Sequence, residues 1–354
     1  MSHVLGNYLR RRVAGQILGL LLALTGLMQL LELLEVTTEV LDRGLGAAGV
    51  LRYALLRIPS ELLVALPLAG LLGSMAAFYA MARTREITAL RTAGVGLGRV
   101  LLYLLPVPML FALLHVGLAQ KLVPIAEGAL KSWWDSTVPL EKRPADPQWV
   151  RTSRGLLLFE RSSADGMRLL DVRIYERGAD GLLKIATRAD EASWRGDHWE
   201  LVRARDLTVG QGAQPPVQAA RAWDSNLSPD DILQLDAAEP HLSSFALADV
   251  IGGERVSTRP RSFYETVLVQ SLVAPFTVFI MMLLAMPAAI VNERGGGGGK
   301  MLLALFLGLG LLLVDGIFSA FGTSGRISPV LAALAAPLTF ALLGFWQLKA
   351  CERS

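Results

Sequence analysis

The sequence contains few charged residues. Asp, Glu, Lys and Arg make up 18% of its 354 residues, whereas they make up about a quarter of an average soluble domain. The deficit is concentrated in long stretches, which excludes an ordinary soluble domain. Five stretches have no charged residue and a sixth has only Asp315; they are residues 13–31, 62–82, 100–120, 266–292, 327–348 and, last, 301–325.

Recognisable catalytic, metal-binding and redox motifs are also lacking. The single cysteine, Cys351, excludes an internal disulfide, and the four histidines are scattered, which predicts no metal site. The glycine run 295–299 before Lys300 resembles a phosphate-binding loop, but Arg294 and Met301 break the required pattern. We therefore expect a flexible loop there, no catalytic residue and no cofactor. Any ATP would be hydrolysed by a separate chain.

The six apolar stretches are predicted to be transmembrane helices. Crossing about 30 Å of hydrocarbon takes about 20 helical residues, and only helices and closed barrels satisfy their backbone groups in lipid. None of the stretches shows the alternation of barrel strands. The alternative, buried helices of a large soluble core, requires shorter or amphipathic runs. We predict an α-helical polytopic membrane protein with about six spans.

Lys and Arg in the short loops predict the orientation of the spans. One side combines the acids Glu86, Glu293 and Glu352 with many more bases: Arg10, Arg11, Arg12, Arg83, Arg85, Arg91, Arg99, Arg294, Lys300, Lys349 and Arg353. The other side has the bases Arg43, Arg52, Arg57 and Arg326 and the acids Glu32, Glu35, Glu39, Asp42 and Glu61. The first side is predicted to be cytoplasmic, with both termini, and the polar segment between the third and fourth spans lies outside.

That polar segment has the pattern of a β-domain. Short β-type runs at 155–160, 167–175, 182–187, 198–202 and 206–209 alternate with turn signals. Their regular spacing predicts an antiparallel sandwich or open jelly roll. Trp194 and Trp199 flank the turn at 196–197 and are expected to be packed hairpin partners. The predicted domains are residues 1–120 with three spans, 121–261 with the β-domain, and 262–354 with three further spans.

Some polar residues fall inside or close to the predicted spans. Gln29, Glu32 and Glu35 recur every three residues, on one face of the first helix. Acids in a membrane are costly and usually face a cavity or a partner; for Glu35, reaching the outer interface is an equal alternative. Asp315 lies in the middle of the fifth span and needs a partner, a cavity or a proton.

Residues 82–94, here called the coupling segment, join the second and third spans. The segment predicts a short charged helix that ends near Gly94, a helix-terminating residue. Glu86 is its only acid among several arginines. Two interpretations stay open: a lever on which a cytoplasmic partner docks, with Glu86 bound by an arginine of that partner, or an ordinary interfacial loop.

Taken together, these features resemble the LptF/LptG permease family, which extracts lipopolysaccharide from the inner membrane of Gram-negative bacteria. The resemblance covers nearly the whole chain: the layout of three spans, β-domain and three spans, and the local sequences at 85–94, 226–230, 274–278 and 314–318. The last three favour the LptG branch.

The resemblance implies the partners and the location. They are an LptF-like second permease, an LptB-like ATPase dimer that binds ATP and Mg, an LptC-like single-span β-jellyroll protein, and lipopolysaccharide, in the bacterial inner membrane with a periplasmic β-jellyroll. Residues implied in ATPase coupling are Arg83, Arg85, Glu86, Leu90 and Arg91. Residues implied in a lateral gate are Asp315, Ile317 and Phe318.

The substrate site departs from the family. Better-studied members carry lysines where this chain has Gln29, Glu35 and Val36, and two arginines where it has Lys131 and Trp134. The substrate residues are then expected to be Gln29, Glu32, Arg52, Arg57, Lys121 and Lys131. Phosphate groups are bound by cationic side chains. These cations come either from the basic residues of this set or from the partner permease. Alternatively, the substrate carries fewer phosphates.

Two other functions compete with lipid export. One is a membrane subunit that transmits ATPase motion to a periplasmic hydrolase without moving lipid. The other is a membrane-embedded lipid-modifying enzyme, which would need catalytic acids and histidines near one interface. The only acidic cluster, Glu32, Glu35, Glu39 and Asp42, has no histidine beside it. Export is the preferred prediction.

Overall fold

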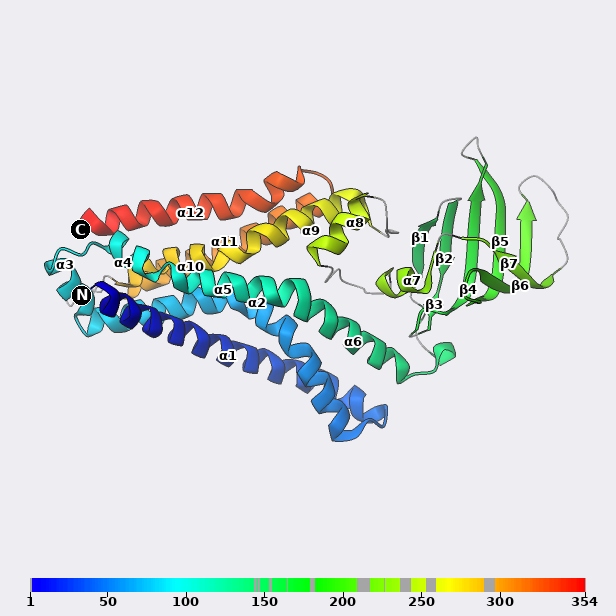
Figure 1. The fold of residues 1–354 in the computed structure, drawn as a ribbon, viewed down its shortest axis with the longest axis horizontal. Coiled ribbons are helices and arrows are strands. Elements are labelled where there is room, and N and C mark those ends of the chain that lie inside the picture. The colour runs from blue at the N-terminus through cyan, green and yellow to red at the C-terminus, as the bar shows by residue number, and fades with distance from the viewer. Residues whose placement is uncertain are drawn as a thin grey trace. The chain divides into compact units, whose positions relative to one another are not determined.

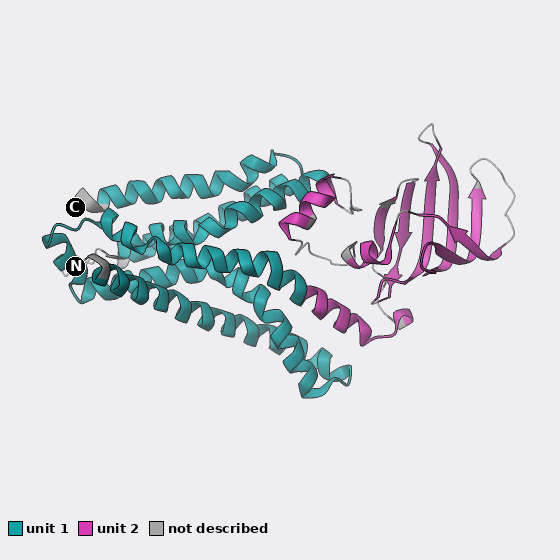
Figure 2. Cartoon of the chain, viewed as in Figure 1, with its two compact units in different colours: residues 1–126, 261–354 teal, residues 127–260 magenta. Residues whose placement is uncertain are grey.

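The computed structural model describes residues 2–142, 145, 147–152, 155–163, 165–178, 182–208, 217–225, 227–235, 243–252, 259–289 and 297–353. Asn226, Arg294 and part of the glycine run lie outside the described residues. The chain forms two compact units (Figure 2): a helical unit of residues 1–126 and 261–354, and a second unit of residues 127–260. The first boundary follows Ala126, inside a helix.

Six helical runs in the described part are long and apolar enough to cross a membrane, so the predicted number of spans is confirmed. They are Val4–Asp42, Gly46–Arg83, Leu97–Ser136, Arg261–Ala288, Gly299–Thr323 and Pro329–Ala350. The elements that form them are α1 (Ser2–Asp42), α2 (Gly46–Arg83), α4 (Leu97–Leu104), α5 (Pro106–Gly117), the π-helix η1 (Leu118–Leu122), α6 (Val123–Ser136), α9 (Arg261–Val273), η3 (Ala274–Phe276), α10 (Thr277–Leu284), η4 (Met286–Ala289), α11 (Gly297–Thr323) and α12 (Pro329–Arg353).

Some helices differ in length or shape from the predicted apolar stretches. α1 continues to Asp42, so Glu32 and Glu35 belong to the same helix as the first span. The third run continues to Ser136, so Lys121 and Lys131 lie on a helix. The fourth run is interrupted by η3 at Pro275, which has no amide hydrogen to donate to a helical bond. α1 begins and α12 ends at the end of the helical unit that carries α3 (Figure 1).

Small residues on α2 let α1 approach closely. α1 buries Leu9, Val13, Ile17 and Leu21 along one face, four residues apart. A Cβ atom added at Gly73 of α2 would lie 2.5 Å from the Cα atom of Ile17. Close backbone contact of this kind drives helix association where lipid offers no hydrophobic advantage.

Gly73→Ala is therefore expected to force α1 and α2 apart. Overpacking of this kind costs about 1–3 kcal/mol, so the thermal unfolding midpoint of the purified protein in detergent should fall. Gly19→Ala on α1 is the matched control, because a Cβ atom there meets nothing within 4 Å. Equal midpoints for the two variants would contradict the close packing of α1 on α2.

The second unit contains an antiparallel sheet, which confirms the predicted inserted β-domain. Its strands pair in the order β1-β2-β4-β5-β6-β7, with β3 on β4, so consecutive strands are mostly neighbours. The prediction missed β1, β3 and β7, and its runs 198–202 and 206–209 form one strand. The strands are β1 (Gln148–Thr152), β2 (Gly155–Phe159), β3 (Arg161–Ser162), β4 (Arg168–Arg177), β5 (Leu183–Trp194), β6 (Trp199–Thr208) and β7 (Gln218–Trp223).

One face of the sheet is apolar and packs against the segment that follows β7. The helix α7 (Pro229–Leu235) starts with a reciprocal cap: the Ser228 hydroxyl accepts from the Asp231 amide at 3.3 Å, and the Ser228 amide donates to the Asp231 carboxylate at 2.9 Å. Leu227 and Ile232 are buried against the sheet. The remaining described helices are η2 (Leu140–Lys142), α3 (Glu86–Thr92) and α8 (Ser244–Gly252).

Trp199 anchors this core. It is fully buried, and its indole N–H donates to the carbonyl of Leu227 at 2.9 Å. It pairs with Trp194 across the hairpin with ring centroids 5.4 Å apart, which confirms the predicted tryptophan pair.

Trp199→Ala should unfold or strongly destabilise the β-domain. Truncation of a buried tryptophan costs about 3–5 kcal/mol, and here it also leaves the Leu227 carbonyl without its donor. Urea unfolding followed by circular dichroism of the strands would measure the loss. Trp194→Ala removes the half-buried partner and should cost less; a larger loss for Trp194→Ala would contradict the central role of Trp199.

Candidate coupling and substrate sites

The coupling segment folds as the short helix α3, bounded by two left-handed residues. Arg85 precedes it with φ 60° and turns the chain sharply after α2. At the other end Gly94 has φ 82°; its amide donates to Arg91 at 3.0 Å, and the amide of Val95 donates to Leu90 at 2.9 Å. This pair of bonds is a Schellman motif, which confirms the predicted helix end at Gly94.

Glu86 is held by groups of its own chain. Its carboxylate accepts from the Arg12 guanidinium at 2.5 Å, from the Thr84 hydroxyl at 2.7 Å and from the Tyr8 hydroxyl at 3.1 Å. Arg12 also donates to the Tyr8 hydroxyl. The sequence pattern predicts Arg12 only as a topological charge, whereas in the structure it joins α1 to α3.

These contacts change the titration of Glu86. Burial alone would raise the pKa of the carboxyl, but the hydrogen bonds from Thr84 and Arg12 outweigh it and lower the pKa below its ordinary value. A carboxyl with a lowered pKa adds stability that is present at neutral pH and is lost as the pH falls below the ordinary range of Glu. The tie between α1 and α3 therefore persists at physiological pH.

The other coupling residues face outward. Arg83, Arg85 and Arg91 are exposed, whereas Glu86 and Leu90 are half-buried and Ile87 is buried. The accessible surface of the coupling segment is thus basic, and its one carboxylate already has three donors. Within this chain Arg12 binds the Glu86 carboxylate; that an arginine of a docked protein binds Glu86 stays a prediction.

A second polar cluster joins α1 and α2. The Glu32 carboxylate accepts from the Arg57 guanidinium at 2.7 Å and from the Tyr53 hydroxyl at 2.8 Å. The Gln29 amide, oriented to satisfy its neighbours, donates to the Glu61 carboxylate at 2.9 Å. Glu61 is only 3% exposed, and one of its oxygens has no hydrogen-bond partner in the described structure. Glu61 is not among the residues that the sequence predicts for the substrate site.

The cluster brings together only part of the predicted substrate site. Gln29, Glu32 and Arg57 meet, and the two carboxylates of Glu32 and Glu61 outnumber the single guanidinium. Arg52 is an exposed residue of α2. Lys121 and Lys131 lie on η1 and α6 of the third run. A phosphate approaching Arg57 therefore competes with a carboxylate already bound to it.

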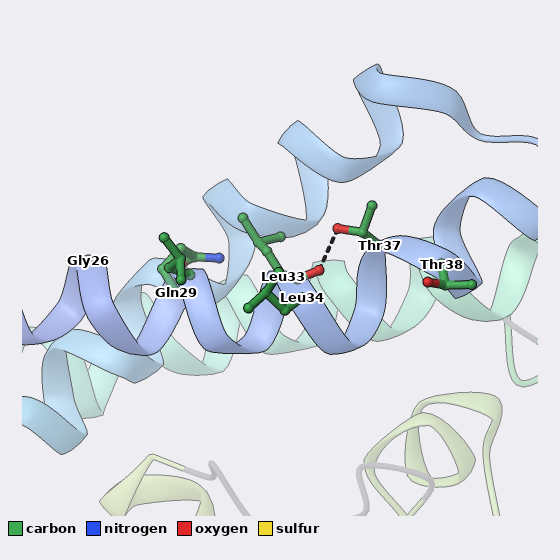
Figure 3. Close-up of a pocket in the computed structure, with 7 residues that line it drawn as sticks. Gly26, Gln29, Leu33, Leu34, Thr37 and Thr38 are labelled. Atoms are coloured by element: carbon green, nitrogen blue, oxygen red, sulfur yellow. Dashed lines mark hydrogen bonds between the residues drawn. The ribbon is translucent and has the colours of Figure 1, made fainter.

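A groove of about 530 Å³ runs along α1 beside this cluster (Figure 3). It is mostly apolar, and the Thr37 hydroxyl on its wall donates to the carbonyl of Leu33. Gln29 is the polar residue that connects the groove to the α1–α2 cluster. The lining residues are Gly26, Gln29, Leu30, Leu33, Leu34, Thr37 and Thr38.

The predicted gate residues lie on α11. α11 packs against α9 and α12, with a hydrogen bond of 3.2 Å from Ser319 to Gln270. Ile317 is exposed, and Asp315 and Phe318 are half-buried. Within the described residues, no hydrogen bond or ion pair of Asp315 is recorded. None of the three gate residues lines the groove of α1.

The fold and these sites define a polytopic membrane protein with an inserted antiparallel β-domain and a short helix at the turn after its second span. The chain matches the family described as lipopolysaccharide export system permease LptF/LptG over residues 7–350. It belongs to that family, as the sequence analysis predicted.

Relatives that share one name within the family match nearly the whole chain. The lipopolysaccharide export system permease protein LptG of Escherichia coli K12 is 21% identical over 352 residues, which make up 98% of each chain. The protein of the same name from Haemophilus influenzae is 21% identical over 361 residues, 99% of each chain. The prediction of the LptG branch agrees with these names.

Proposed function

We propose that this chain is the permease subunit of an ABC-type exporter that extracts lipopolysaccharide from the outer leaflet of the bacterial inner membrane. The observation that carries the proposal is the family match along essentially the whole chain. The chain's own architecture supports it, because six spans and an inserted β-domain provide both a membrane path and an extramembrane apolar core.

The partners follow from the same proposal. An LptF-like permease completes the lipid cavity, an LptB-like ATPase dimer binds ATP and Mg, and an LptC-like protein continues the β-path. Both termini and α3 then face the cytoplasm, and the β-domain faces the periplasm. Exposed Arg83, Arg85 and Arg91 meet the ATPase, while the Arg12–Glu86 pair passes the motion of α3 to α1.

The work done on the lipid is mechanical. Each CH₂ group of an acyl chain exposed to water costs about 0.8 kcal/mol, so several chains cannot leave the bilayer unaided. Closure of the ATPase moves α3 and α1, the cavity beside the α1 groove collapses, and the lipid moves toward the β-domain. Asp315, Ile317 and Phe318 on α11 form the lateral gate toward the partner permease.

Native mass spectrometry of the complex, purified in mild detergent from its own host, tests this function. Recovery with a second permease, two ATPase chains and bound lipopolysaccharide is the expected result, and it identifies the lipid. Recovery with an ATPase and a periplasmic hydrolase, without lipid, would replace export by transmission of motion. Recovery of the chain alone, without lipid, would also overturn the proposal.

A further inference from the structure

A row of cross-strand neighbours lies on the face of the sheet opposite the Trp199 core; its second member, Leu158, is only 6% exposed, and the other four are exposed or half-buried. Strand register aligns Trp149 with Leu158, Leu158 with Arg173, Arg173 with Arg188, and Arg188 with Arg205. The neighbours of these residues in sequence, such as Val172, Ala189 and Ala204, belong to the core on the other face. We call Trp149, Leu158, Arg173, Arg188 and Arg205 the outer row.

Three consecutive members of the outer row are arginines. Residues directly opposite on neighbouring strands have Cβ atoms about 5 Å apart, where like charges destabilise a sheet. Arg173 forms an ion pair with the Glu160 carboxylate at 3.4 Å. For Arg188 and Arg205, both exposed, no ion pair occurs among the described residues. Folding alone therefore disfavours this arrangement of charge.

An aromatic surface adjoins the arginines. Trp149 is 50% exposed and stacks on Tyr175, with ring centroids 5.8 Å apart and an angle of 22° between the rings. The stack leaves a flat apolar surface at one end of the outer row. Four steps between neighbouring strands separate Trp149 from Arg205, which is about 19 Å.

We propose that the outer row binds an acidic oligosaccharide. The C–H face of a sugar ring packs on an exposed indole, which combines an apolar body with a polar edge. Guanidinium groups bind carboxylates and phosphates in a bidentate way. A saccharide with repeated acidic groups matches both features and the length of the row. The proposal rests on the proposed function, in which the saccharide is that of the transported lipopolysaccharide.

The binding test uses the full-length protein in detergent. The probe is the lipid-free oligosaccharide released by mild acid from the host's lipopolysaccharide, and calorimetry gives its Kd. Removing two guanidiniums in Arg188→Gln/Arg205→Gln should weaken binding about a hundredfold, or about tenfold for each. Arg195→Gln is the matched control: Arg195 is exposed on the same domain, lies at the hairpin turn away from the row, and should leave the Kd unchanged.

Three results would overturn the assignment: an unchanged Kd in the double variant, equal weakening in Arg195→Gln, or tighter binding of neutral maltoheptaose than of the acidic probe. Tighter binding of a polyglutamate peptide than of the oligosaccharide would also overturn it, and would assign the face to an acidic protein. Because the assay contains no ATPase or second permease, its outcome is independent of whether the chain assembles an exporter.

A stability measurement separates binding from a structural role. Arg188→Glu places a carboxylate between Arg173 and Arg205, and should raise the thermal unfolding midpoint while it abolishes oligosaccharide binding. The two readouts then move in opposite directions. If Arg188 serves only to stabilise the sheet, the same variant lowers the midpoint, and the proposal fails.

Discussion

Glu86→Arg is expected to reduce ATP-driven lipid release by about a hundredfold, because it sets a second guanidinium against Arg12 and like charges in such contact cost several kcal/mol. The double variant Arg12→Glu/Glu86→Arg restores opposite charges at the same positions. We expect it to recover most of the activity. Release of lipopolysaccharide from proteoliposomes that contain the whole complex measures both.

The charge swap also distinguishes two roles of Glu86. If its functional partner is an arginine of the ATPase, exchanging charges within this chain cannot restore the contact, and the double variant stays inactive. Glu86→Gln is the milder control, since the amide oxygen can still accept from Arg12 and Thr84, at 2.5 and 2.7 Å in the native chain, and only the acceptor of the Tyr8 hydroxyl is lost. It should lose far less activity than Glu86→Arg.

The contrast between Arg12 and Gly94 shows what the sequence could predict here. Gly94 signals a helix end through a local rule, the need for a left-handed residue after the last turn. The pairing of Arg12 with Glu86 joins residues far apart in the chain. Arg12 stands in a run of three arginines that the positive-inside rule already explains, so no local pattern distinguishes it from Arg10 and Arg11.

The same distinction explains the sheet and the helix contacts. Exclusion of charge predicts the spans because lipid is the same solvent for all of them. β7, with the sequence QAARAW, lacks β-branched residues and becomes a strand by pairing with β6. Gly73 and Gly19 look alike in sequence, yet only Gly73 touches another backbone.

Only part of the polar cluster of α1 and α2 can be predicted from the sequence. The spacing of Gln29 and Glu32 predicts that they share a helix face, and the structure confirms that they belong to one cluster. That Arg57 is bound by Glu32, and that Glu61 lies beside Gln29, depends on how two helices cross. This pairing gives Arg57 a role as the cation that neutralises Glu32, while its role as a phosphate ligand stays a prediction.

Glu32→Gln should consequently strengthen binding of a phosphorylated lipopolysaccharide to the purified complex by about tenfold, because it removes a carboxylate that competes for Arg57. Glu35→Gln is the matched control: it removes the same charge from the next turn of α1, where the exposed side chain has no recorded contact among the described residues with Arg57. Affinity is measured by lipid titration in detergent. Equal gains for both variants would indicate general charge rather than this pair.

Arg57→Ala is expected to lower the stability of the protein. It leaves Glu32 and Glu61 without their cation, which we expect to cost about 2–3 kcal/mol, less than a fully buried pair because Arg57 is partly exposed. Adding Glu32→Gln to Arg57→Ala should restore most of the unfolding midpoint, since the repelling charge is then gone. If Arg57 were a dedicated phosphate ligand, Arg57→Ala would weaken lipid binding at an unchanged midpoint, and Glu32→Gln would bring no rescue.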